Sequence, residues 1–261
     1  MDKNVVRLAA VGDIHYTRKS QGLLVKEFSQ LSQLCDVLVL CGDLTDYGLP
    51  EEAEVLLHDL AVVNVPIVAV LGNHDFESGR QDELMRMFAG AGVHMLDGDA
   101  VELHGVGFAG VKGFGGGFGR RTLGAWGEKA IKNFVQEALD EAMKLEAAMS
   151  RLRMQEKIVV LHYAPIQATA TGEPLEIMPF LGSSRLEEPI VRYRASAVFH
   201  GHAHHGSLEG KTKSDVPVFN VCFPLLKRSF PDQLPFRFYD VPRESADRDA
   251  AVTSGADVVI R

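Results

Sequence analysis

Five polar segments of this chain each follow directly on a run of apolar residues, and this pairing is the feature that most constrains the fold. The runs cover residues 5–11, 37–41, 67–71, 158–161 and 197–199. Buried strands of a parallel sheet have such near-continuous apolar sequences, whereas strands with one solvent-exposed face alternate apolar and polar residues. Polar residues that follow parallel strands meet at the carboxyl edge of the sheet, where open α/β folds bind their ligands. The sequence therefore predicts an α/β fold with its chemistry at one sheet edge.

The polar segments supply side chains that are typical metal ligands. They read Asp-Ile-His at 13–15, Gly-Asp at 42–43, Gly-Asn-His-Asp at 72–75, a single His at 162, and Gly-His-Ala-His at 201–204. The candidate ligands are Asp13, His15, Asp43, Asn73, His162, His202 and His204. This mixture of carboxylates, imidazoles and an amide oxygen suits transition metals. Seven ligands are too many for one tetrahedral centre, and they are consistent with two adjacent cations that share Asp43.

A pair of cations predicts a reaction class. Two metals roughly 3.5–4 Å apart can hold both the attacking and the leaving oxygen of an in-line phosphoryl displacement. They also lower the pKa of a bound water, which supplies hydroxide near neutral pH. We therefore expect a metal-dependent phosphoric ester hydrolase in which a metal-bound hydroxide attacks phosphorus.

The ordered set of segments resembles the calcineurin-like metallophosphoesterases, and the resemblance extends from Asp13 to His204. It implies a four-layer α/β/β/α sandwich with the dimetal site at the carboxyl edge of the strands. The resemblance also implies how the ligands divide. One metal would be bound by Asp13, His15, Asp43 and His204, and the other by Asp43, Asn73, His162 and His202.

Further residues take roles from the same resemblance. His74 resembles the non-ligand histidine of the family, which stabilises the transition state or protonates the leaving oxygen. Asp46 resembles the carboxylate that orients this histidine, and Asp75 is the alternative for that role. His205 extends the last segment and is either a substrate contact or a supporting residue. The motif set is closest to the phosphodiesterase and cyclic-nucleotide branch, although it resembles monoesterases as well. We expect a diester rather than a monoester substrate, because the sequence shows no obvious device specific for monoesters. Tyr47 stands where calcineurin-type protein phosphatases carry arginine, which argues against a phosphoprotein substrate.

Residues 105–119 contain eight glycines and form the most unusual segment of the chain. The segment matches the dinucleotide fingerprint only formally, because no helix begins where a pyrophosphate would bind, and the P-loop pattern fails as well. Two interpretations remain open. One is a strand over residues 105–111 that runs into a turn. The other is a flap over the metals, whose substrate-contacting residues would be Lys112, Arg120 or Arg121 for phosphate and Phe114 or Phe118 for an apolar group.

The remaining patterns predict one domain over residues 1–242 and a polar tail over 243–261. Apolar periodicity and helix-start signals predict helices over residues 23–34, 50–63, 81–90 and 128–153. In the last of these we expect one apolar face that includes Ile131, Val135, Leu139 and Met149. Residues 216–222 and 236–241 have the composition of further strands, which we assign to an antiparallel second sheet.

Bulk properties exclude several classes of protein. The net charge of −8 argues against non-specific binding of nucleic acid, which makes a nuclease of this fold the weaker alternative. No apolar segment approaches the roughly 18 residues that span a bilayer, and the N-terminus leaves no room for a signal peptide. Three cysteines without paired spacing indicate reduced thiols and a cytoplasmic location. A scaffold without turnover is the second alternative, although every ligand position is filled.

The sequence leaves the cofactor and substrate partly open. Mixed nitrogen and oxygen ligation is compatible with Mn, Fe, Co, Ni and Zn as the two divalent ions. The expected partner is a small-molecule phosphate ester, and no stripe or motif marks an interface with another chain.

Overall fold

The apolar runs form the central strands of two β-sheets rather than of one. In the computed structural model, which describes residues 5–242, the first sheet has the strand order β11-β1-β2-β3-β4 and the second has the order β5-β6-β7-β8-β10-β9. The first sheet contains β1 (Val5–Val11), β2 (Val37–Cys41), β3 (Ile67–Val70), β4 (His94–Met95) and β11 (Arg237–Pro242). The second contains β5 (Asp99–Leu103), β6 (Val106–Val111), β7 (Lys157–Leu161), β8 (Ala197–His200), β9 (Glu209–Lys211) and β10 (Pro217–Asn220). The predicted tail over 243–261 lies outside the described residues.

The interior strands of both sheets are parallel, and antiparallel strands lie only at their edges. β1, β2, β3 and β4 pair in parallel, as do β6, β7, β8 and β10, whereas β11, β5 and β9 pair antiparallel. The assignment of residues 216–222 and 236–241 to an antiparallel second sheet was only partly right, because β10 lies in the second sheet and pairs antiparallel with β9 but that sheet is mixed and β11 is not part of it. β10 pairs in parallel with β8, and β11 crosses back to the first sheet, where it pairs with β1. Composition alone does not specify which sheet, or which neighbouring strand, a strand far along the chain pairs with.

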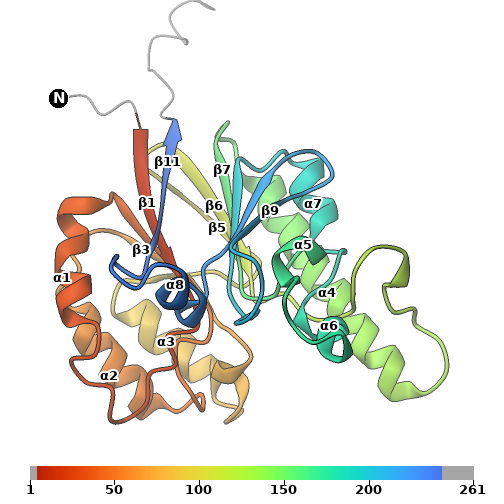
Figure 1. Cartoon of the computed structure of the whole chain (residues 1–261), viewed down its shortest axis with the longest axis horizontal. Helices are drawn as coiled ribbons and strands as arrows, with labels where there is room; N and C mark the ends of the chain where they lie inside the picture. The colour runs from red at the N-terminus through yellow and green to blue at the C-terminus, as the bar shows by residue number, and fades with distance from the viewer. Residues whose placement is uncertain (1–4, 243–261) are drawn as a thin grey trace, which may run out of the picture.

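The two sheets pack face to face between two layers of helices, as the family resemblance implies (Figure 1). The first sheet is covered by α1 (Val25–Leu34), α2 (Pro50–Leu60) and α3 (Gln81–Gly90), and the second by α4 (Lys129–Arg151) and α7 (Glu187–Arg192). Alternate side chains of the second sheet pack against the first sheet on one face and against α4 on the other. Phe108 and Val160 pack toward the first sheet, whereas Ala109 and Val159 pack with residues of α4.

The longest helix, α4, is only partly covered. Val135 and Met149 of its expected apolar face are buried, but Ile131 and Leu139 are exposed. The N-terminal turns of α4 extend beyond the second sheet (Figure 1). The expectation of one continuous buried face was wrong at Ile131 and Leu139, although Val135 and Ala138 in the same half of the helix are buried.

Short elements occupy the carboxyl side of the sheets, and the sequence patterns did not predict them. They are the 3-10 helices η1 (His74–Phe76), η2 (Gly119–Arg121) and η3 (Leu175–Ile177), and the helices α5 (Gln167–Ala170), α6 (Met178–Leu181) and α8 (Phe223–Ser229). Among residues 5–242 there is no helix with both the length and the apolar character needed to span a bilayer.

Candidate metal centre

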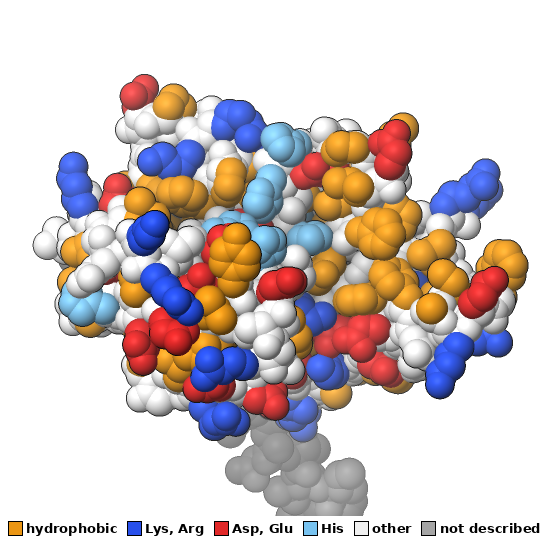
Figure 2. All heavy atoms as spheres, turned by 90° about the horizontal axis from the view of Figure 1, so that it is seen from below, with side chains coloured by type: hydrophobic (Ala, Val, Ile, Leu, Met, Phe, Trp, Pro, Cys, Tyr) orange, Lys and Arg blue, Asp and Glu red, His pale blue; other side chains and the backbone are white. Residues whose placement is uncertain are grey.

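All five polar segments lie at the same end of the molecule, although they come from two sheets. The first three follow β1, β2 and β3 of the first sheet, and the last two follow β7 and β8 of the second. Figure 2 views this end, and histidine side chains gather near its middle. Because the strands that precede the segments are parallel within each sheet, their carboxyl ends bring the polar side chains together across the sandwich.

Four of the candidate ligands have a backbone conformation that residues other than glycine rarely adopt. The φ angles of Asp13, His15, Asp43 and His202 are 56°, 43°, 48° and 70°. Such conformations cost about 1–3 kcal/mol each and persist where the surrounding structure imposes them, often at functional sites. Here they turn the chain sharply as it leaves a strand, which keeps these polar side chains at the sheet edge.

Two glycines make room for the carboxylates. A Cβ atom on Gly72 would lie 2.1 Å from Oδ1 of Asp43, and one on Gly201 would lie 2.3 Å from Oδ2 of Asp13. Neither position could hold a larger residue without moving an aspartate. The glycines of the Gly-Asn-His-Asp and Gly-His-Ala-His segments are thus explained by close approach to the other segments.

Asp13 joins the first segment to the last. Its Oδ1 lies 3.0 Å from Nε2 of His204, and its two oxygens accept hydrogen bonds of 2.9 and 3.0 Å from the backbone N–H of His202. Asp13, His15 and His204 form a group whose potential ligand atoms all lie within 4.8 Å of one another.

Asp43 lies between this group and a second one. Its Oδ2 is 3.7 Å from Nε2 of His15, and its Oδ1 is 3.4 Å from Nε2 of His162. Asp43, His162 and His202 form the second group within the same 4.8 Å limit. Oδ1 of Asn73 lies 2.9 Å from Nε2 of His162, which places the amide oxygen at this second group.

The ring orientation of His162 is fixed by the backbone. Its Nδ1 bonds to the carbonyl oxygen of Cys41 at 3.0 Å, so this nitrogen donates and Nε2 carries the lone pair toward Asn73 and Asp43. Metal-binding histidines are commonly oriented by a hydrogen bond of this kind. Burial lowers the pKa of His162, which also favours the neutral, ligating form of the imidazole.

Hydrogen bonds among the candidate ligands leave some of their polar atoms without a partner, and bound cations would supply one. Both ring nitrogens of His15 are buried and have no hydrogen-bond partner within the described part of the chain. Buried polar atoms are rarely left without a partner. Nε2 of His15 faces Asp13, Asp43 and His204, and a cation among these groups would give it one.

The pKa values of the clustered side chains also favour bound cations. Burial raises the pKa of Asp43 to about 7, and the negative charge of Asp13 adds to the effect. Burial lowers the pKa of His15 to about 4, and burial together with the nearby His162 lowers the pKa of His202 to about 3. The His204–Asp13 hydrogen bond raises the pKa of His204. Burial raises the pKa of Asp13, but the His204 hydrogen bond and the charges of His162 and His204 together outweigh it and hold the pKa of that carboxyl below its usual range. Divalent cations would stabilise both carboxylates in their charged form.

His74 stands at the rim of the cluster. Its Nδ1 bonds to the backbone carbonyl of Asp46 at 2.8 Å, while the Asp46 carboxylate is 3.8 Å from the same nitrogen and 3.3 Å from Nδ1 of His15. His15, Asp46 and His74 form a third close group of potential ligand atoms. Asp46 therefore contacts His74 mainly through its backbone.

Asp75, the alternative for orienting His74, has a different position. It is fully buried, and its oxygens accept hydrogen bonds from the backbone N–H groups of Leu44, Thr45 and Gly72 and from the hydroxyl of Thr45. These hydrogen bonds connect the segment after β2 with the segment after β3. No hydrogen bond links its carboxylate to the His74 ring within residues 5–242.

The glycine-rich segment is built into the second half of the sandwich. Its first part is β6, and after it Phe114 packs against Phe134 and Tyr163, while Phe118 is buried. Lys112 is also buried, at the end of β6.

The other residues expected to contact the substrate are either exposed or held by a hydrogen bond. Arg120 and Arg121 are exposed on η2. The backbone N–H of His205 donates to Glu173 at 2.6 Å, a contact that sequence reasoning did not anticipate.

Two further neighbours of the cluster were missed. The Phe180 carbonyl oxygen of α6 lies 3.1 Å from Nε2 of His202, and the ring of Tyr163 lies 4.4 Å from the His202 ring. Tyr163 directly follows His162, which was the only available signal; nothing in the sequence around α6 marks it as part of the site.

Comparisons with known proteins agree with this geometry. The sequence model of the family described as calcineurin-like phosphoesterase matches residues 6–206. The fold resembles that of a phosphopantetheinyl hydrolase from Mycobacterium tuberculosis, with a TM-score of 0.66 and 16% identity over 90% of this chain and 96% of that one. A protein from Thermus thermophilus has a TM-score of 0.54 and 15% identity, with 92% and 100% covered. An anchor in the inner membrane complex of Plasmodium reaches 0.50 at 14% identity, with 85% and 73% covered. A sequence search of curated proteins found no match.

Proposed function

The chain belongs to the calcineurin-like phosphoesterase family, and from this premise we propose that it hydrolyses a small phosphate ester with the help of two divalent metal ions. The family and the fold support a phosphoester hydrolase in general. An anchor protein shares the fold, so the fold alone does not imply turnover. The complete set of candidate ligands is what supports an enzyme here over a scaffold.

The observation that carries the proposal is the position of Asp43 between two groups of ligands. One of its oxygens faces His15 and the other faces His162, which is the arrangement expected of a bridging carboxylate. We assign one cation to Asp13, His15, Asp43 and His204, and the other to Asp43, Asn73, His162 and His202. When bound, such a pair supplies Lewis acidity to the phosphoryl oxygens and lowers the pKa of a coordinated water.

The residues of the chain supply the remaining chemistry. The Nδ1–H of His74 donates to the Asp46 carbonyl, so the other ring nitrogen is free to exchange a proton with the ester oxygen. The side chain of His74 is 43% exposed, so it can reach a substrate above the metals. We assign His74 as the general acid and Asp46 as the residue that positions it. We also propose that Lys112, Arg120, Arg121 and His205 contact the substrate.

The finer identity of the reaction rests on smaller observations. Mixed N and O ligation is consistent with manganese or iron, and also with Zn, Co or Ni. A diester is the proposed substrate because, among the described residues, none near the metals serves as a device specific for monoesters. The buried free thiols of Cys41 and Cys222 suit a reducing compartment such as the cytoplasm.

Metal reconstitution tests the proposal. The protein is stripped with a chelator and reloaded separately with Mn²⁺, Fe²⁺, Co²⁺, Ni²⁺, Zn²⁺ or Mg²⁺, and each form is assayed with bis-nitrophenyl phosphate and nitrophenyl phosphate. We expect hydrolysis with at least one transition metal and faster turnover of the diester. His202→Ala should abolish it, whereas His58→Ala, an exposed histidine of α2 outside the site, should not. Inactivity toward both esters with every metal would overturn the hydrolase, and a clear monoester preference would overturn the diester assignment.

A further inference from the structure

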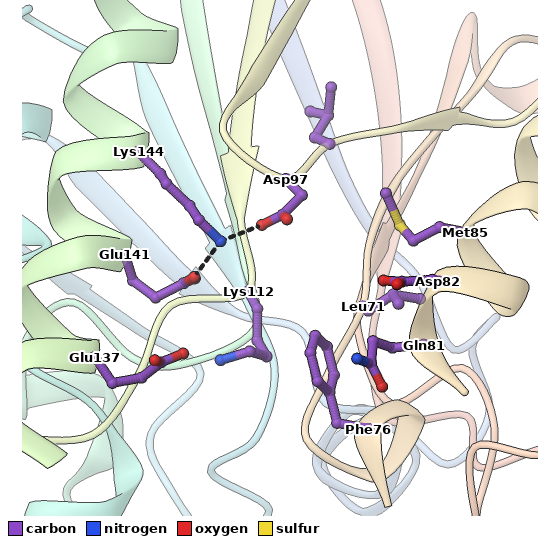
Figure 3. A pocket seen from close by; sticks show the side chains of 11 residues that line it. Leu71, Phe76, Gln81, Asp82, Met85, Asp97, Lys112, Glu137, Glu141 and Lys144 are labelled. Atoms are coloured by element: carbon purple, nitrogen blue, oxygen red, sulfur yellow. Dashed lines mark hydrogen bonds and ion pairs between the residues drawn. The ribbon is translucent and has the colours of Figure 1, made fainter. Parts of the chain in front are cut away.

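A cavity of about 120 Å³ lies between the two halves of the sandwich, next to the candidate metal centre (Figure 3). One wall includes Leu71, Phe76 and Met85 from the segments that follow β3, and the other includes Glu141 and Lys144 of α4. The cavity has room for several water molecules or for one small polar group.

Three residues of the cavity adjoin candidate metal ligands. Leu71 precedes Asn73 by two positions, and Phe76 follows Asn73 by three positions. The backbone oxygen of Lys112 accepts a hydrogen bond of 3.0 Å from the N–H of His162. The cavity is therefore placed beside the second group of ligands, where part of a bound substrate other than its phosphorus could lie.

Lys112 is a buried cation with few partners. It is 8% exposed, and its Nζ makes one hydrogen bond, to the carbonyl oxygen of Gly113 at 2.8 Å. No carboxylate of residues 5–242 lies within ion-pair distance of it. The rings of Phe76, Phe114 and Tyr163 surround the ammonium at 5.2, 5.0 and 5.5 Å.

The aromatic rings compensate for the burial of Lys112 only in part. Cation–π contacts stabilise an ammonium by about 0.5–2 kcal/mol each, but two of its three N–H groups remain without an acceptor among the described residues. Burial lowers the pKa of Lys112, and the charges of Glu141 and Glu137 oppose this effect. A buried charge that lacks hydrogen bonds is costly, and an acceptor that enters the cavity would reduce this cost.

The carboxylates that line the cavity have other partners or lie at its rim. Lys144 bridges Asp97 at 3.0 Å and Glu141 at 2.9 Å, and Glu141 also accepts the backbone N–H of Gly113 at 2.7 Å. Glu137 is exposed on α4 and makes no ion pair within the described residues (Figure 3). Lys112 is thus the buried charge of the cavity that no carboxylate in this part of the chain neutralises.

The ring of Tyr163 lies next to Lys112. It is 8% exposed, and in the part of the chain that is described its hydroxyl has no hydrogen-bond partner. Its ring contacts both Lys112 and His202, so one aromatic residue connects the cavity with the metal ligands.

We propose that this cavity binds a carboxylate carried by the alcohol component of the phosphate ester, and that Lys112 is the residue that binds it. The inference rests on the proposed function, because it assigns the second recognition element of that substrate. A carboxylate matches the cavity in size and accepts charge-assisted hydrogen bonds from an ammonium. One negative charge also suits the site better than a second phosphate dianion, since Glu137 and Asp82 line the rim.

Binding of non-hydrolysable probes tests the inference without turnover. Calorimetry on the manganese-loaded protein would compare phosphonocarboxylates of increasing chain length with alkylphosphonates of the same lengths. We expect one chain length at which the carboxylate tightens binding about tenfold, as a charge-assisted hydrogen bond would do. Lys112→Met should remove this preference, and Lys112→Gln, which keeps a donor but loses the charge, should reduce it. Lys132→Met, the same change at an exposed position of α4 outside the cavity, should leave it intact.

The outcomes separate this inference from the proposed function. Equal affinity for both probe series at every length would overturn the carboxylate site, even if the protein hydrolyses simple esters. A preference that survives Lys112→Met in a folded protein would overturn the role of Lys112. If Lys112→Met does not fold, Lys112→Gln decides, because an unchanged preference in that variant contradicts the role of the ammonium charge. Absence of hydrolysis with every metal would refute the proposed function while the binding comparison still reports on the cavity.

Discussion

Adding one methyl group at Gly72 should damage the metal centre far more than it damages the fold. A Cβ there would lie 2.1 Å from Oδ1 and 2.2 Å from the backbone nitrogen of Asp43. Atoms in folded proteins do not approach a Cβ closer than about 3 Å, so Asp43 or its neighbours must move by roughly 1 Å. Gly72 does not have a positive φ, so the clash is the only cost of the Gly72→Ala substitution.

The size of the effect follows from the role of Asp43. A misplacement of about 1 Å in a catalytic arrangement costs about 100-fold in rate, which corresponds to about 2.7 kcal/mol of transition-state stabilisation. Overpacking of this kind lowers the free energy of unfolding by about 1–3 kcal/mol. We therefore expect Gly72→Ala to fold, to melt several degrees lower, to lose about 100-fold in kcat/KM and to retain less than the full metal content.

The assay measures kcat/KM with bis-nitrophenyl phosphate, metal content by mass spectrometry and the melting temperature on the same preparations. Gly90→Ala is the matched control, because Gly90 ends α3 with nothing within 4 Å of its Cβ position; it should keep full activity and gain a little stability. If Gly72→Ala retains wild-type kcat/KM and full metal content, Asp43 does not bridge two cations in the proposed arrangement.

Three further predictions concern the same site. His74→Ala should keep both metals but lose about 10²–10⁴-fold in kcat, the usual contribution of a general acid; loss of metal instead would show that His74 is a ligand. Because the pKa of Asp43 is about 7 in the metal-free chain, protons compete with metal below that pH, so Mn²⁺ affinity measured by calorimetry should rise from about pH 6 to pH 8; constant affinity would contradict this. Arg120→Ala should raise KM for an anionic ester without changing metal content, and unchanged kinetics would remove Arg120 from substrate binding.

The sequence predicted the parts of the fold that depend on local pattern. The strand over residues 5–11 and the helix over residues 81–90 have the predicted bounds, because an apolar run or an amphipathic period decides them. The partner of β11 could not be predicted, since the antiparallel pairing with β1 joins residues more than two hundred positions apart. The exposure of Ile131 and Leu139 on α4 was missed for a similar reason: periodicity shows which face is apolar but not how far the sheet beneath it extends.

The candidate site divides in the same way. The side chains brought together at the sheet edge were all visible as short motifs, and their convergence followed from the strands before them. The left-handed conformation of Asp13 and Asp43 was not visible, because it is imposed by contacts between segments. The position of Asp75 was also unpredictable, since its partners are backbone N–H groups, which every residue but proline carries. Tyr163 and the cavity at Lys112 depend on packing across the two halves.

The central claim is that one carboxylate holds two cations, and anomalous diffraction from manganese-loaded crystals tests it most directly. The structure predicts two anomalous peaks roughly 3.5–4 Å apart, with an oxygen of Asp43 bound to each, His15 beside one and His162 beside the other. A single peak, or two peaks of which one has no contact with Asp43, would contradict it.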